Sequence, residues 1–141
     1  MSTQTAKSEY MLLFRGTDWD RALSLEEIEK VMNQWTAWME GLSQQGKIAA
    51  AQALDRYEGK IVSWRREYMV ADGPFAESKE AIGGYFLLQV DDMEEAVEIA
   101  KQCPTLKYGL DVEVRRLAEE CPTFQRVKEE RREAAALSRG H

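Results

Sequence analysis

The stretch that decides the fold runs from residue 9 to residue 46 and reads EYMLLFRGTDWDRALSLEEIEKVMNQWTAWMEGLSQQG. Its first part, residues 9–15, predicts a β-strand in which Tyr10, Leu12 and Phe14 alternate with Met11 and Leu13. Both faces of this strand are therefore apolar. Two apolar faces favour a position near the middle of a sheet that is covered on both sides.

A long helix follows, and both of its ends are marked in the sequence. Ser24 and Glu27 have the spacing of a capping box, in which each side chain accepts a hydrogen bond from the backbone amide of the other residue. Gly46 supplies a left-handed stop. Between these ends, apolar side chains recur at alternating spacings of three and four and predict one buried stripe: Leu25, Ile28, Met32, Trp35, Met39 and Leu42.

The rest of the chain predicts further strands and a second helix. Strands are expected at residues 47–54, 60–64, 67–71, 81–90 and 110–117, with 60–64 and 67–71 forming a hairpin. Asp91 or Asp92 caps the second helix, which Cys103-Pro104 ends because proline cannot continue the hydrogen-bond ladder. From Pro122 the chain is helix-prone and highly charged. It is either a solvated terminal helix or an arm that docks on a partner subunit.

This order of elements predicts an α+β fold of the ferredoxin-like (split β-α-β) type with an added hairpin. We expect a disordered N-terminal tail at residues 1–8, the ferredoxin-like domain at 9–117, and a charged C-terminal helix and tail at 118–141. Two helices cover one face of such a sheet, so the other face needs a cover for its apolar side chains. Sheet-to-sheet pairing of two copies, a homodimer, supplies it. The competing arrangement is a monomer with the terminal helix folded across the sheet.

Composition excludes several classes of function. The chain has 141 residues and a formal net charge of −6, which makes nucleic acid an unfavourable partner. No apolar run is long enough to span a bilayer, and the polar start lacks the apolar stretch of a signal peptide, so we expect a cytoplasmic protein that has no membrane partner. Cys103 and Cys121 are expected to be reduced, partly buried thiols. His141 is the only histidine, which excludes most histidine chemistry inside the fold.

The fifteen residues from Asp72 to Phe86 read DGPFAESKEAIGGYF. They resemble the hallmark of the YCII-related domain family, and specifically of its DGPF branch. Four shorter matches extend the resemblance over residues 9–117: YMLL at 10–13, WTAWM at 35–39, CP at 103–104 and VEVR at 112–115. A block of fifteen residues is far more specific than a lone glycine motif.

The resemblance implies a ferredoxin-like domain that forms a dimeric α/β-barrel. Some relatives are proposed to use a His and Asp pair in catalysis, and Asp72 matches the Asp of the DGPF motif. This sequence departs from that pattern because His141 is its only histidine. Other relatives are encoded beside, or fused to, alternative sigma factors, which makes a sigma factor a candidate partner.

The segment from Asp72 to Lys79 is the first candidate site. Gly73 and Pro74 shape a loop that can hold Asp72, Glu77, Ser78 and Lys79 close together at the mouth of the sheet. Their carboxylate, hydroxyl and ammonium groups suit a catalytic Asp72 with Glu77, Ser78 and Lys79 binding the ligand. Alternatively, Asp72 bonds the turn amides, and Glu77 and Lys79 form a solvent ion pair.

The last strand carries the second candidate site. If Val112 and Val114 face the helices, Glu113 and Arg115 face the opposite side of the sheet, together with Tyr85. Charges there are unfavourable unless they are paired or used, so these three residues are ligand-binding candidates for a small polar molecule. The alternative is an edge strand whose charges meet water and discourage aggregation.

Other features bear less on function. Trp35 fits the core better than a ligand platform, whereas Trp38 lies off the main stripe and could flank a cleft. Gly83-Gly84 is too short for a phosphate loop, no cofactor signature is present, and no spacing of His, Cys or carboxylates suggests a metal site. Two functions remain: a small-molecule enzyme or ligand binder with its cleft beside Asp72–Lys79, or a non-catalytic interaction module that regulates transcription initiation through a sigma factor.

Overall fold

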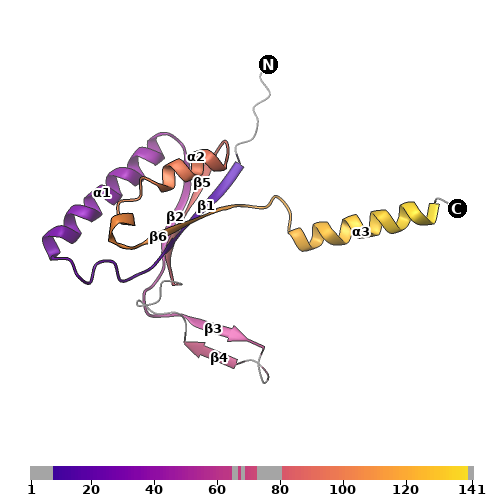
Figure 1. Cartoon of the computed structure of the whole chain (residues 1–141), viewed down its shortest axis with the longest axis horizontal. Helices are drawn as coiled ribbons and strands as arrows, with labels where there is room; N and C mark the ends of the chain where they lie inside the picture. Colours follow the sequence, from indigo (N-terminus) through magenta and orange to yellow (C-terminus); the bar gives the residue numbers. More distant parts are fainter. Residues whose placement is uncertain (1–7, 65–66, 68, 73–80, 140–141) are drawn as a thin grey trace, which may run out of the picture.

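The structure is a computed structural model that describes residues 8–64, 67, 69–72 and 81–139. Its elements follow the predicted order (Figure 1). They are β1 (Ser8–Arg15), α1 (Leu25–Gln44), β2 (Ile48–Ala53), β3 (Lys60–Ser63), β4 (Met69–Asp72), β5 (Ile82–Val90), α2 (Met93–Ala100), a short 3-10 helix (Leu106–Tyr108), β6 (Asp111–Arg116) and α3 (Pro122–Arg139).

Four strands form one antiparallel sheet in the order β2-β5-β1-β6. β1 lies between β5 and β6, which confirms the central position that its two apolar faces predict. The hairpin β3-β4 forms a separate two-stranded sheet. This architecture is a mixed α/β domain compatible with the ferredoxin-like prediction, because the two central strands are the first and third of the four in the chain.

The core lies between this sheet and the helices α1 and α2. Leu12 and Leu88 are fully buried at its centre, and Leu42 of α1 and Ala96 of α2 pack on the same cluster. In Figure 1 both helices lie on one side of the strands. One face of the sheet is therefore covered by helices, as predicted.

Both ends of α1 agree with the sequence prediction. The Glu27 amide donates to the Ser24 hydroxyl at 3.2 Å, and the Ser24 amide donates to the Glu27 carboxylate at 3.1 Å, which completes the capping box. Gly46 adopts φ 69°, the left-handed conformation expected after a helix. The predicted stripe is only partly buried: Leu42 is buried, whereas Leu25 is 80% exposed.

Two predictions about the second half of the chain were wrong. α2 ends at Ala100, before Cys103-Pro104, because the chain turns at once and the Cys103 amide donates to the Ala100 carbonyl. Cys103 is buried, but Cys121 is exposed rather than partly buried. Cys121 directly precedes α3, and this helix projects from the body of the domain (Figure 1).

The face opposite α1 and α2 carries a mixture of apolar and charged side chains. Met11 pairs with Leu87, and Leu13 pairs with Tyr85, and all four side chains are partly exposed. On β6, Val112 and Val114 pair with buried residues of β1, so Glu113 and Arg115 lie on the opposite face, as predicted. We call this surface the open face.

Two elements project from the body of the domain. The β3-β4 hairpin and α3 both stand clear of the four-stranded sheet in Figure 1, and every residue of α3 is exposed. α3 therefore does not fold across the open face in this structure. Within the described ranges, none of the helices combines the length and apolar character needed to span a bilayer.

Candidate functional site

The candidate site begins with small residues on the edge strand β2. Ala51 pairs with Phe86 and Ala53 with Gly84, so both alanines lie on the face that α1 covers. A Cβ atom added to Gly84 would come within 2.7 Å of the Gln52 carbonyl oxygen, so only glycine allows this strand contact. Little side-chain volume is left to fill the space between α1 and this edge of the sheet.

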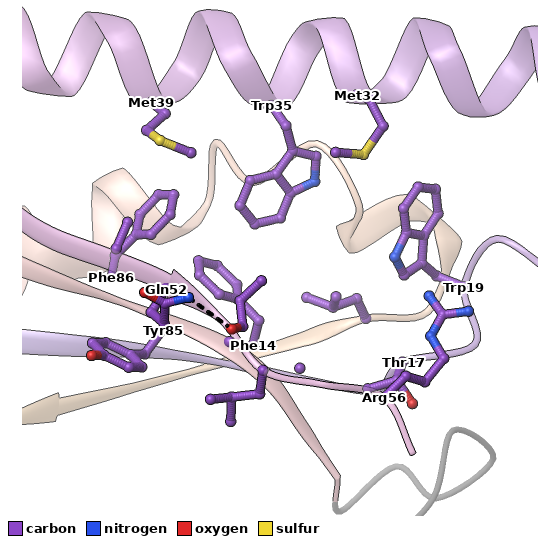
Figure 2. A pocket seen from close by; sticks show the side chains of 16 residues that line it. Phe14, Thr17, Trp19, Met32, Trp35, Met39, Gln52, Arg56, Tyr85 and Phe86 are labelled. Atoms are coloured by element: carbon purple, nitrogen blue, oxygen red, sulfur yellow. Dashed lines mark hydrogen bonds between the residues drawn. The ribbon is translucent and has the colours of Figure 1, made fainter. Parts of the chain in front are cut away.

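A cavity of about 490 Å³ occupies that space. Its volume is within the range of small-molecule sites, about 300–1,000 Å³. Figure 2 shows Met32, Trp35 and Met39 pointing into it from α1. The lining comes from β1, α1, β2, β5 and adjoining loops: Phe14, Thr17, Trp19, Met32, Trp35, Met39, Ala51, Gln52, Ala53, Leu54, Arg56, Gly83, Gly84, Tyr85, Phe86 and Leu110. We call this cavity the α1 pocket.

Aromatic rings form the inner wall of the α1 pocket and hold one another in place. The ring centroids of Phe14 and Trp35 are 4.8 Å apart, and those of Phe14 and Phe86 are 4.9 Å apart, both in edge-to-face geometry. Such pairs contribute about 0.5–1.5 kcal/mol each beyond their area burial. The wall is therefore preorganised, and a ligand entering the pocket needs to order few side chains.

The pocket explains why the predicted stripe of α1 is incompletely buried. Met32 remains 47% exposed and Met39 37% exposed, although both belong to the apolar face of the helix. They face the pocket instead of a filled core. Methionine is flexible and polarisable, so these two side chains can adapt to ligands of different shape.

Arg56 is the one charged side chain in the described lining of the pocket. Its Nη1 atom lies 3.5 Å from Oδ2 of Asp20, and both side chains are partly exposed. The other carboxylate oxygen of Asp20, Oδ1, is buried and has no hydrogen-bond partner among the described residues. The Asp20–Arg56 pair thus places a weakly held guanidinium beside a mainly apolar cavity.

A tight turn after β2 positions Arg56. Oδ1 of Asp55 accepts hydrogen bonds from the backbone amides of Tyr57 and Glu58, both at 2.8 Å. The Glu58 and Tyr57 amides, in that order of effect, hold the pKa of Asp55 below its ordinary value. These hydrogen bonds hold the bend around Arg56, and the Arg56 side chain lies at the end of the pocket near Trp19 (Figure 2).

The described lining of the α1 pocket is mainly apolar and aromatic. It contains no histidine, cysteine or carboxylate side chain. Across the described part of the chain, no group of three or more His, Cys, Asp and Glu side chains could hold a metal ion. What the pocket offers a ligand is a mainly apolar, aromatic cavity with the polar side chains of Thr17 and Gln52 and one guanidinium.

The structure places three of the predicted site residues, Tyr85, Glu113 and Arg115, on the open face of the sheet. Tyr85 belongs to the pocket lining, although its ring lies on the side of the strand away from α1 (Figure 2). Glu113 and Arg115 lie outside the pocket on the open face. Asp72 ends β4 and its backbone pairs with Lys60, whereas its side chain and the residues Glu77, Ser78 and Lys79 lie outside the described residues.

On the open face, Glu113 is held between two guanidinium groups. Its carboxylate accepts from Arg15 at 2.9 Å and from Arg115 at 3.2 Å. The hydrogen bond from Arg115, followed by that from Arg15, keeps the pKa of Glu113 below its ordinary value. Because Glu113 is paired on both sides, this cluster fits an ordered, charged border of the open face.

The two tryptophans of α1 have different surroundings. Trp35 packs on Phe14 against the core, as predicted, and its side chain also lines the pocket. Trp38 does not belong to the described lining, and packs on Phe86 at 5.1 Å with its Nε1 atom buried and without a described partner. Sequence reasoning missed Trp19 and Arg56. The sequence signal for the pocket was the run of alanines in β2, of which Ala53 pairs with Gly84.

These observations define a small α+β domain with a ligand-sized cavity between its first helix and the edge of its sheet. The profile of the YCII-related domain family matches residues 10–132. The chain therefore belongs to the YCII-related domain family, and the match extends into α3.

The chain also resembles an uncharacterised protein over part of its length. The chain is 33% identical over 82 residues to an uncharacterised protein of Rhizobium meliloti (strain 1021), in a match that covers 57% of this chain. The match spans 66% of that relative's length, just under two thirds.

Proposed function

We propose that this YCII-related protein binds a small, mainly apolar molecule in the α1 pocket. The observation that carries the proposal is the cavity of about 490 Å³ whose walls are aromatic and methionine side chains. Burial of apolar ligand surface supplies the driving force, about 25 cal/mol per Å² before the losses of association. The preorganised rings reduce those losses.

A neutral fluorescent probe tests this proposal. N-phenyl-1-naphthylamine brightens in apolar surroundings, and we expect the purified protein to bind it in a saturable manner. Ala51→Leu fills the pocket from β2 and should weaken binding by about tenfold, which corresponds to about 1.4 kcal/mol. Ala50→Leu is the matched control because Ala50 pairs with Leu87 on the opposite face of the same strand. Equal affinities in the two variants, or no saturable signal, would exclude the pocket.

The predicted loop site is a separate part of the proposal. The DGPF motif supports the DGPF branch and a catalytic role for Asp72, with Glu77, Ser78 and Lys79 binding a polar group of the substrate. The backbone of Asp72 pairs with Lys60 in the β3-β4 hairpin. The Asp72→Asn variant distinguishes the two roles of Asp72. If the carboxylate is catalytic, the variant should lose any turnover that the wild type shows. If Asp72 only accepts turn hydrogen bonds, the variant should keep that turnover.

The assembly we propose is a homodimer joined through the open face, as in a dimeric α/β-barrel. Met11, Leu13, Tyr85 and Leu87 form a contiguous apolar patch by strand register, and all are partly exposed. The cluster of Arg15, at the end of β1, with Glu113 and Arg115 of β6 borders this patch. An apolar centre with a charged rim is the composition of a protein interface.

α3 favours a second candidate function, an interaction module that binds a sigma factor. The helix is exposed along its whole length, and its apolar residues Phe124 and Leu137 are 67% and 73% exposed. Isolated helices are only marginally stable in water, so a partner that covers these residues would stabilise α3. A sigma factor should be retained by the Asp72→Ala variant and lost on truncation after Cys121. Retention by the truncated chain would contradict this function.

A further inference from the structure

We infer that the ligand of the α1 pocket carries a carboxylate that Arg56 binds at the mouth of the cavity. The inference rests on the proposed function and specifies its ligand class: an aromatic or other apolar body with one carboxylate. Two independent features support it, namely the charge of the lining and the geometry of the Asp20–Arg56 pair.

The lining favours an anion over a cation. Trp19, Trp35 and Phe14 could surround a cation by their ring faces, but a cage for a cation usually adds a negative group. The described lining contains no carboxylate, and its one charge is the guanidinium of Arg56. A cationic ligand would meet this positive charge in a partly desolvated cavity, where repulsion is stronger than in water.

The Asp20–Arg56 pair leaves Arg56 able to accept a second anion. A guanidinium has five N–H donors in a planar fork that matches a carboxylate. Among the described residues Arg56 makes one ion pair, at 3.5 Å, which is long for a charge-assisted hydrogen bond. A ligand carboxylate can therefore bind free donors of Arg56 and compete with Asp20 for the rest.

The overall charge of the protein makes this local selection necessary. The chain carries a formal net charge of −6, which disfavours anions over most of its surface. A carboxylate ligand is attracted only where a cation is presented next to apolar surface. Arg56 at the edge of the α1 pocket provides that combination.

Calorimetric titration with two matched probes tests the inference. The probes are 2-naphthoate and its neutral isostere 2-naphthamide, which share an apolar body and differ in charge. We expect the wild-type protein to bind the naphthoate about tenfold more tightly, because a hydrogen bond to a charged group is worth more than one between neutral groups. Equal affinities, or tighter binding of the amide, would overturn the inference and leave the proposed function intact.

Variants of the pair locate the effect. Arg56→Gln should abolish the preference for the naphthoate, Arg56→Lys should retain part of it, and Arg131→Gln on the exposed helix α3 should leave it unchanged. Asp20→Asn removes the competing carboxylate and should tighten naphthoate binding without affecting the amide. A preference that survives in a folded Arg56→Gln variant would overturn the inference. Failure of both probes, together with failure of the neutral fluorophore, would overturn the pocket itself.

Discussion

Individual residues in this protein take their roles from what lies across the strand or the helix from them. Gly84 is required because a side chain would meet the carbonyl of Gln52, and Ala51 leaves space because it faces α1. Glu113 was predicted to face away from the helices, and it does. Its pairing with both Arg115 and Arg15 could not be predicted from the sequence. Arg15 reaches it through strand pairing over a separation of 98 residues in the chain.

The pairing of Glu113 predicts a pH-dependent contribution to stability. Hydrogen bonds from Arg115 and Arg15 lower the pKa of Glu113 in the folded protein. Its contribution is therefore present above the pKa of the unfolded carboxyl, about 4.3, and is lost as the pH falls through the folded value. The destabilisation caused by Glu113→Gln, measured by urea unfolding, should be larger at pH 7 than at pH 3. Glu129→Gln on α3 is the control. An equal loss of stability at both pH values in the Glu113→Gln variant would contradict the expectation.

At the scale of elements, periodicity predicted the strands and helices well but not how tightly they pack. The capping box and Gly46 define α1 because capping is local chemistry. Burial of its stripe depends on what lies beneath, and the alanines of β2 with Gly84 leave Met32 and Met39 partly exposed. The α1 pocket was therefore not predictable from the helix alone. Both features that create it, the apolar stripe of α1 and the small residues of β2 and β5, are present in the sequence.

The contact between β2 and β5 can be tested through its glycine. Gly84→Ala places a Cβ atom 2.7 Å from the Gln52 carbonyl oxygen, so the strands must separate. We expect a loss of about 1–3 kcal/mol in the free energy of unfolding, as for overpacked sites. Gly41→Ala is the matched control, because no atom lies within 4 Å of its added Cβ and a helical alanine should stabilise α1 by about 0.5–1 kcal/mol. Denaturant unfolding that shows no loss for Gly84→Ala would contradict the strand contact.

At the scale of the whole molecule, several exposed apolar surfaces lie outside the compact body. The β3-β4 hairpin exposes Val62, and Trp64, which directly follows β3, is 72% exposed. A lone two-stranded hairpin is marginally stable in water, and the same holds for an isolated helix such as α3. The chain therefore projects elements that gain stability when a second molecule covers them, and the open face adds a third such surface.

The fold class was accessible from the sequence because the order of strands and helices restricts the topology to few solutions. The surfaces available for assembly are harder to predict from the sequence, because their side chains belong to no single periodic pattern. The apolar patch of Met11, Leu13, Tyr85 and Leu87 combines two strands that are about seventy residues apart in the chain. Their two-faced apolar pattern indicated the patch, while its charged border of Arg15, Glu113 and Arg115 became visible only with the register of β6.

The proposed homodimer through the open face can be tested by a single charge placed in the apolar patch. Leu13 lies between Tyr85 and Glu113 in the sheet, and it is partly exposed, so Leu13→Lys should leave the monomer folded. In a two-fold interface each such change appears twice, so the dimer would bury two added charges against apolar surface. Light scattering after gel filtration should give twice the chain mass of 16.2 kDa for the wild type and the single mass for the variant.

A second lysine placed elsewhere separates the interface from a general effect of charge. Val62→Lys changes an equally apolar, exposed residue on the β3-β4 hairpin and should retain the wild-type mass. The ion pairs of the border cluster form within one chain, so added salt should leave the apolar centre of the dimer bound. A wild-type protein that elutes as a folded monomer at all concentrations would show that the partly exposed patch on the open face does not pair with its own copy.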